Sequence, residues 1–401
     1  MLRDHQLAHK GFALFELGFR PFFLAAGLYA VVAMLLWIVL YRFGGGVNQI
    51  QISPLTWHAH EMIFGYGMAV IAGFLLTAVH NWTNLDTGRN WKLAVMVLLW
   101  LMARVGFWLS PWVPLAAVAL VDLLFTLVWW VSIAVPVIRN GQYRQLVILV
   151  IAALFLLCQL VFYAGALGWL TGGEHIGLYA GFYLMIFLIL VMSRRVFPMF
   201  IERGIAAIAP DQQLKNPGWL DVAVLALFVA FALSQLITNS GYLLQAGISL
   251  ALALLLLIRL VFWYRHASWK RPLVWVLYVS HCWLVIGFTL QAGAALGWLS
   301  PFLPLHALAV GSLGMVTLGM MARVSIGHTG RNVFQPPVPL TFTFVCLGLS
   351  ALARVILPLF WPRLYLDWVL LSQCLWILAF AVFIGHYAPM LLLARADGKA
   401  G

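Results

Sequence analysis

Residues 57–81 read WHAHEMIFGYGMAVIAGFLLTAVHN, an apolar segment with histidines near both ends. The segment is long enough to cross the membrane core, which takes roughly 20 residues of α-helix. Residues 306–330 read HALAVGSLGMVTLGMMARVSIGHTG and repeat the pattern. In both segments the same number of residues separates the two outermost histidines, so we predict two membrane-spanning helices with an imidazole at each end.

The repeat continues past these two segments. The helices that carry it are predicted to cross the membrane in the same direction, so the repeat is parallel and covers helices 2–3 and 10–11. Inverted repeats are the more usual mark of transporters, which weighs against transport. The repeated features are the histidine pairs His58/His80 and His306/His328, Thr-Gly-Arg-Asn at 87–90 and 329–332, and Ala-Arg-Val at 103–105 and 353–355.

The composition predicts an all-α, polytopic membrane protein. Of the 401 residues, 64% are hydrophobic and only 8% are charged, far from the balance of a soluble domain. No linker divides the chain, so residues 1–401 are expected to form a single transmembrane domain of about twelve helices. The apolar runs lie near 21–41, 57–79, 92–109, 113–136, 146–169, 178–200, 219–238, 242–263, 273–297, 302–325, 339–360 and 365–392.

The basic residues predict the orientation. An even number of helices places both termini on one side. With that side cytoplasmic, all of the 23 Lys and Arg residues fall at inner ends or loops except Arg42, Arg363, Arg104 and Arg354. This bias predicts that both termini face the cytoplasm. The net charge of +12 is therefore explained by the lipid bilayer as partner, and no basic run interleaved with aromatics indicates nucleic acid.

Histidines at the outer helix ends are the first candidate site. Ionisable groups within a membrane are costly and usually mark function. His58, His60 and His306 are predicted to lie at the same outer level and to ligate haem or another metal. His58 and His60 point about 200° apart on a helix, so they suit two centres better than one. Glu61, one turn from His58, is expected to orient that imidazole.

A second group of histidines is predicted near the inner face. His80 and His328 share the repeat and are candidates to ligate or support a second centre. His281 and His386 are single occurrences that either ligate a metal or hydrogen-bond the backbone.

Arg104 and Arg354 occur near the outer ends of their helices, at the depth of the outer histidines. A buried guanidinium suits planar carboxylates such as haem propionates. Two alternatives stay open: each arginine pairs with a carboxylate such as Asp122 or Asp367, or each extends to the lipid headgroups.

Five blocks of the sequence, taken together, resemble the NnrS family. They extend from residue 18 to residue 331 and so cover most of the chain. The blocks are GFRPFF at 18–23, WHAHEM at 57–62 with Gly65-Tyr66, GFLLTA at 73–78 with Asn81-Trp82-Thr83, FPMF at 197–200 with Glu202-Arg203-Gly204, and GHTGR at 327–331.

The resemblance implies a twelve-helix bacterial inner-membrane (cytoplasmic membrane) protein that contains haem b and copper. It also implies a role in nitric oxide metabolism or resistance, during denitrification and nitrosative stress. Nitric oxide is then the expected small-molecule partner, bound at haem iron. The resemblance assigns no ligands, so the site residues named above rest on spacing and depth alone.

Other function classes leave few signals in this sequence. His58-Ala59-His60 is similar to the H-x-H pair of haem-copper oxidases and nitric oxide reductases, but no His-His dipeptide is present. No P-loop, Rossmann fingerprint or Ser-His-Asp order is found. The open alternatives are a nitric oxide reductase-like redox enzyme with an electron donor, a transporter of metal or nitrosyl-iron, and an accessory protein for cofactor insertion. Whether the protein is an enzyme is left undecided.

Overall fold

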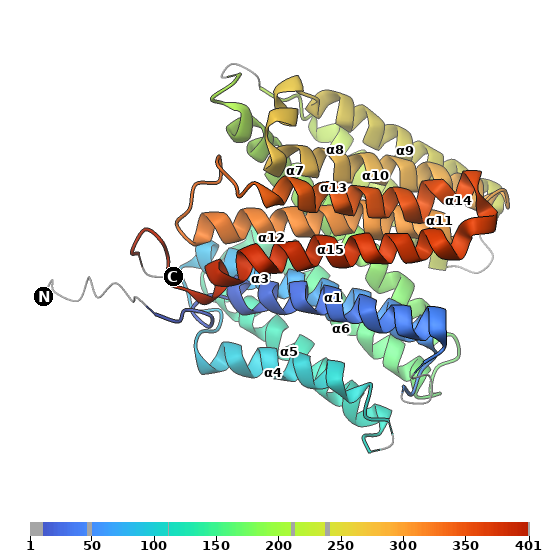
Figure 1. Cartoon of the computed structure of the whole chain (residues 1–401), viewed down its shortest axis with the longest axis horizontal. Helices are drawn as coiled ribbons and strands as arrows, with labels where there is room; N and C mark the ends of the chain where they lie inside the picture. Colours follow the sequence, from blue (N-terminus) through green and yellow to red (C-terminus); the bar gives the residue numbers. More distant parts are fainter. Residues whose placement is uncertain (1–10, 46–49, 111, 210–212, 237–240, 400–401) are drawn as a thin grey trace, which may run out of the picture.

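The computed structural model describes residues 11–45, 50–110, 112–209, 213–236 and 241–399. Its long helices lie side by side, with α4 and α5 at one edge, α8 and α9 at the opposite edge, and α1 beside α15 between them (Figure 1). All twelve expected helices are found among the described residues, which confirms the polytopic helical bundle. Eleven of them are long and apolar enough to cross a membrane.

The first half of the chain begins with α1 (Phe19–Phe43). The second crossing is composite and joins a short α-helix, a π-helix and a longer α-helix without a break. The remaining helices up to residue 205 follow with short connections. Their bounds are α2 (Pro54–His60), η2 (Glu61–Gly67), α3 (Met68–Thr83), α4 (Trp91–Gly106), α5 (Leu115–Arg139), α6 (Leu146–Ala166) and α7 (Gly173–Ile205).

The second half contains two composite crossings, each with a π-helical segment. Three short 3₁₀ turns, Tyr143–Gln145, His266–Lys270 and Pro362–Leu364, lie in connections. The helices are α8 (Gly218–Leu236), α9 (Tyr242–Trp263), α10 (Pro272–Ala295), α11 (Phe302–His306), η5 (Ala307–Gly314), α12 (Met315–His328), α13 (Pro339–Ala351), η6 (Leu352–Ile356), α14 (Leu357–Phe360) and α15 (Tyr365–Leu392).

Helix α4 is the one expected crossing that falls short of membrane length. It has 16 residues, about 24 Å at 1.5 Å per residue, against a hydrocarbon core of about 30 Å. Its last turn holds Arg104, which is 2% exposed. The helix therefore ends where a charged side chain is buried among neighbouring helices.

The two ends of the described chain pair with each other at one end of the bundle. The amide of Ala13 donates to the carbonyl of Leu392 over 2.8 Å. Arg20, fully buried near the start of α1, donates from Nη1 to the carbonyl of Leu393 over 2.7 Å. A cation interacts favourably with the free carbonyls at a helix C-terminus, so Arg20 caps the C-terminus of α15. This pairing confirms that the chain crosses the bundle an even number of times.

Two of the family-like sequence blocks meet in this region. The amide of Phe19 in GFRPFF donates to Thr77 Oγ1 in GFLLTA over 3.0 Å. Another basic residue expected at an inner helix end, Arg259, is also buried and pairs with Asp221 Oδ1 at 2.8 Å. Arg20 and Arg259 therefore connect neighbouring helices instead of facing water.

The structure extends the parallel repeat to a third helix. Pro54 and Phe302 begin their crossings at the same distance before His58 and His306. Each histidine-bearing helix then changes to a π-helix, η2 in the first copy and η5 in the second. Helices α5 and α15 begin equally far after Arg104 and Arg354. Helices α2–α5 and α11–α15 are therefore two copies of one three-crossing unit.

Tyr66 and Thr317 join the two copies directly through a 2.7 Å hydrogen bond between their side-chain oxygens. The outer end of the bundle is the end opposite the paired termini. Because π-helical turns are uncommon and often occur at functional sites, their recurrence makes the outer ends of these helices a candidate functional region.

A separate close contact holds α6 against α7. A Cβ built on Gly165 would lie 2.2 Å from the backbone nitrogen of Glu174. Small residues at such crossings let two backbones approach in a membrane. We expect Gly165→Ala to lower the thermal midpoint of the detergent-purified protein, with an overpacking cost of about 1–3 kcal/mol.

The matched control is Gly247→Ala in α9, where nothing lies within 4 Å of the added carbon. That change should be neutral or stabilise the helix by up to about 1 kcal/mol. Equal midpoints for the two variants would contradict the assignment of Gly165 as a packing contact.

Candidate functional site

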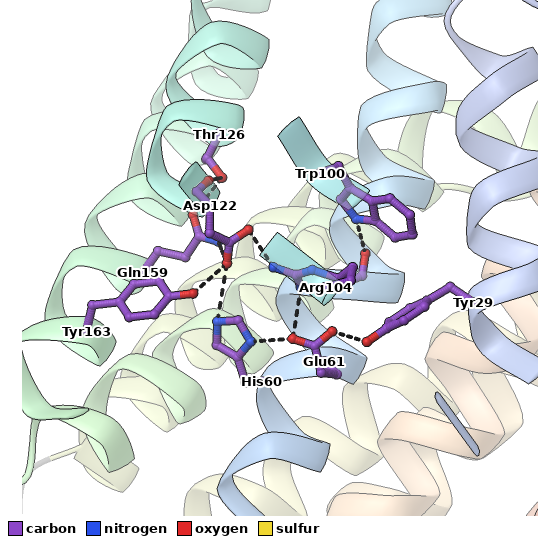
Figure 2. A network of polar contacts seen from close by, with 10 residues as sticks. Tyr29, His60, Glu61, Trp100, Arg104, Asp122, Thr126, Gln159 and Tyr163 are labelled. Atoms are coloured by element: carbon purple, nitrogen blue, oxygen red, sulfur yellow. Dashed lines mark hydrogen bonds and ion pairs between the residues drawn. The ribbon is translucent and has the colours of Figure 1, made fainter. Parts of the chain in front are cut away.

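A group of charged side chains is buried between five crossings of the first half (Figure 2). Arg104 at the end of α4 is its centre. Its Nη1 lies 3.1 Å from Glu61 Oε1 and its Nη2 lies 2.6 Å from Asp122 Oδ1. Glu61 begins η2 and Asp122 lies two turns into α5; both are fully buried. Of the alternatives for Arg104, pairing with Asp122 is the one found.

His60 completes the charged centre. Its Nδ1 lies 2.9 Å from Glu61 Oε1 and its Nε2 lies 3.5 Å from Asp122 Oδ2. The ring is fully buried and packs against Phe162, with centroids 4.5 Å apart. Because each nitrogen of His60 faces a carboxylate, this placement favours hydrogen bonding over the predicted metal ligation.

Neutral side chains satisfy the remaining carboxylate oxygens. Tyr163 donates to Asp122 Oδ2 over 2.8 Å, and Gln159 donates to the same oxygen over 3.1 Å. Tyr29 of α1 donates to Glu61 Oε2. Together, His60, Glu61, Arg104, Asp122, Tyr29, Gln159 and Tyr163 form what we call the buried network.

The formal charges of the buried network do not cancel by themselves. Glu61 and Asp122 bring two negative charges and Arg104 brings one positive charge. A neutral His60 leaves one net negative charge, whereas one additional proton on the network makes it neutral. Because an uncompensated charge in a low-dielectric interior is costly, the two carboxylates and the guanidinium depend on each other.

Local helix geometry makes room for Arg104. Gly65 lies in the π-helix η2, and a Cβ there would come within 2.9 Å of Arg104 Nη1. The carbonyl of Gly65 also accepts a hydrogen bond from Trp100 Nε1 over 3.0 Å. Glu61 was expected to orient His58, yet its carboxylate contacts Arg104, His60 and Tyr29 instead. A buried cation attracts a carboxylate more strongly than a neutral imidazole does.

A second group, the outer cluster, comprises Trp37, His58, His306, Arg354 and Tyr365. His58 turns away from His60 and stacks on Trp37, with ring centroids 4.3 Å apart and planes 4° apart. Arg354 is close enough to His58 and His306 for its charge to act on both imidazoles. The predicted convergence of His58 with His306 is therefore found, although His60 lies elsewhere.

The polar atoms of the outer cluster are incompletely paired. His306 Nδ1 lies 2.7 Å from the carbonyl of Phe302 and donates to it, which leaves Nε2 as the unprotonated nitrogen. Arg354 is 8% exposed and its guanidinium carbon lies 5.3 Å from the ring centroid of Tyr365. Within the described residues, Arg354 Nη1 has no hydrogen-bond partner. The guanidinium hydrogen-bonds the neutral Tyr365, and no carboxylate of the described residues lies within ion-pair distance of it.

The inner histidines are arranged differently. His80 Nδ1 donates to the carbonyl of Leu85 over 2.8 Å, and its Nε2 accepts from Arg89 over 3.1 Å. His328 is near enough to interact electrostatically with His80, and its ring packs on Phe19. The repeat pair is thus brought together, but both nitrogens of His80 are already hydrogen-bonded.

Two single histidines lie apart from both groups. His281 is 1% exposed between Phe197 and Trp263, and its Nε2 lacks a partner among the described residues. His386 is exposed on α15 and its Nδ1 donates to the carbonyl of Val382. No group of three His, Cys, Asp or Glu side chains in the described ranges is placed to hold a metal ion.

The outer cluster offers donors suited to haem. A neutral imidazole whose Nδ1 is hydrogen-bonded presents Nε2 to a metal. A guanidinium whose hydrogen-bonding side-chain partner is the neutral Tyr365 still suits a carboxylate. Sequence reasoning missed Tyr29, Gln159 and Tyr163. Gln159 could have been found, because it is a lone amide in the otherwise apolar run LVILVIAALFLLCQLVF.

Comparison with protein families gives a match over nearly the whole chain. A family model described as NnrS protein matches residues 13–395, nearly the whole chain. No curated protein matches the sequence.

The buried network should be required for stability. Arg104→Gln leaves the two carboxylates without their cation, and removing one partner of a buried ion pair costs about 3–5 kcal/mol. We expect a clearly lower thermal midpoint of the purified protein, measured by tryptophan fluorescence or by size-exclusion after heating.

Lys92→Gln on the same helix is the control. Lys92 forms an exposed 3.5 Å pair with Asp86, and such pairs contribute about 0–1 kcal/mol. If Arg104→Gln unfolded at the same temperature as Lys92→Gln, the network would not be the stabilising unit described here.

Proposed function

Because the chain belongs to the NnrS family, we propose that it acts in nitric oxide metabolism or resistance as a haem- and copper-binding protein of the bacterial inner membrane. Nitric oxide is bound at haem iron in this proposal. The family match supports the link to nitric oxide, and the eleven membrane-length helices support a multi-pass location.

The observation that carries the haem assignment is the convergence of His58 and His306. These imidazoles come from equivalent positions of the two repeat copies and are near enough to interact electrostatically. Arg354 adds a buried cation beside them. Haem b would need an imidazole to hold its iron and a counter-charge for its propionates, and this cluster would supply both.

The remaining residues supply orientation and exclude water. Trp37 holds the plane of His58 by stacking, and the hydrogen bond to Phe302 fixes the tautomer of His306. Haem, when bound, supplies an iron that takes nitric oxide as a ligand. Nitric oxide is small and nearly apolar, so it reaches such a site through the lipid and needs no aqueous channel.

Copper suits imidazole ligands as well. His281 and His328 are the candidates, because no hydrogen bond to a ring nitrogen is found for His281 Nε2 or for His328 in the described structure. His80 is a weaker candidate, since both of its nitrogens are hydrogen-bonded.

The haem assignment predicts the effect of two substitutions. His58→Ala and His306→Ala should each lower haem per chain and weaken the dithionite-reduced absorbance bands, because each removes an imidazole from the proposed haem site. The measurement is the optical spectrum of the detergent-purified variants with haem quantified per chain.

His386→Ala is the control, since His386 is exposed and bonds only the backbone of its own helix. That variant should keep the spectrum of the unsubstituted protein. Full haem retention in both His58→Ala and His306→Ala would overturn the outer site.

A further inference from the structure

The two repeat copies differ in charge around their equivalent arginines. Helices α5 and α15 begin equally far after Arg104 and Arg354, and on this alignment Ser372 takes the place of Asp122. The alignment of His58 with His306 likewise places Ala309 where the first copy has Glu61. Both carboxylates that neutralise Arg104 are therefore replaced by small neutral residues in the second copy.

The position of Ser372 is known from its own contacts. Ser350 Oγ donates to the carbonyl of Ser372 over 2.8 Å, and the two hydroxyls lie 3.0 Å apart. Ser350 precedes Arg354 by one helical turn. Ser372 thus lies on the face of α15 that meets the helix carrying Arg354.

Arg354 reaches a different place from its counterpart. Arg104 pairs with Asp122, two turns into α5, whereas the guanidinium of Arg354 lies over Tyr365, the first residue of α15. The π-helix η6 contains Arg354, and this local change of geometry has no counterpart around Arg104. The second arginine therefore lies beside His58 and His306 instead of within a network.

Burying the guanidinium of Arg354 without a counter-charge costs the protein free energy. Arg354 is only 8% exposed, so its head group is not extended into the headgroup region as a snorkelling arginine would be. A buried guanidinium needs a counter-charge. Tyr365 hydrogen-bonds Arg354 but is neutral, and none of the described residues supplies a carboxylate at ion-pair distance.

We propose that Arg354 binds a carboxylate that the chain does not itself supply, in the way that Arg104 binds Glu61 and Asp122. Within the proposed function, on which this inference rests, that carboxylate is a propionate of haem. Ser372 and Ala309 determine the specificity of the site, because a neutral residue at each position leaves the guanidinium available.

The test compares haem with its dimethyl ester, in which both propionates are methylated. Absorbance titration of the haem-free, detergent-purified protein gives both affinities. We expect haem to bind about tenfold or more tightly than the ester, the size of a charge-assisted hydrogen bond. Arg354→Gln should weaken the affinity for haem by that factor and leave the affinity for the ester unchanged.

Ser372→Asp and Ser372→Asn form a matched pair that differs only in charge. Ser372→Asp restores the carboxylate that Asp122 supplies in the first copy, so it should draw the guanidinium of Arg354 away from Tyr365. It should then weaken haem binding as Arg354→Gln does, and keep the thermal midpoint of the haem-free protein at or above the original. Ser372→Asn should bind haem normally. Arg42→Gln is a control for nonspecific charge, since Arg42 lies in the last turn of α1 in an exposed pair with Asp367.

Three outcomes would overturn the proposal: equal affinity for haem and ester, equal affinity of the two Ser372 variants for haem, or an effect of Arg42→Gln as large as that of Arg354→Gln. If haem binds through His58 and His306 but its ester binds equally well, the proposed function stands and the carboxylate site is wrong. If neither porphyrin binds, both are wrong. Should Ser372→Asp fail to fold, the ester comparison and Arg354→Gln still decide.

Discussion

A guanidinium enclosed within a membrane bundle has to be neutralised, either by the protein or by something that it binds. In the first half of this chain the protein does so itself. Glu61 and Asp122 bracket Arg104, and His60 spans the two carboxylates. These contacts connect η2, α4 and α5, and Tyr29 and Tyr163 extend them to α1 and α6. The packing of the first five crossings therefore depends on one charge balance.

The two repeat copies differ in how the charge of their equivalent arginine is balanced. They share helix starts, histidine positions and the π-helices η2 and η5, but only the first copy contains both carboxylates. In the first copy, the chain's own carboxylates therefore occupy Arg104, and both nitrogens of His60 face Glu61 and Asp122. The second copy leaves Arg354 beside two imidazoles at the outer end. A parallel repeat in which only one of the two arginines is paired with carboxylates fits a cofactor site better than an alternating-access transporter, whose repeats are usually inverted.

The sequence was sufficient to predict the helices but not which way their side chains face. Apolar runs of membrane length gave all twelve crossings, because hydrophobic thickness sets helix length. The equal spacing of His58 and His306 from their partners correctly indicated a repeat. Depth along the membrane is thus readable from the sequence, and the meeting of His58 with His306 follows from it.

Rotation about a helix depends on neighbours that a single sequence does not reveal. The π-helices η2, η5 and η6 have no sequence signature that we could use. Glu61 was expected beside His58 and lies beside Arg104, and Asp122 was one of two partners considered for that arginine. His80, predicted as a ligand from the repeat, has both nitrogens occupied by Leu85 and Arg89.

The proposed function requires that the imidazoles of His58 and His306 hold haem that binds nitric oxide. The most direct measurement is the oxidised and dithionite-reduced optical spectrum of the unsubstituted, detergent-purified protein, recorded before and after adding nitric oxide. We expect sharp b-type bands in the reduced state that shift when nitric oxide is added. A featureless spectrum after expression with ample haem would contradict it.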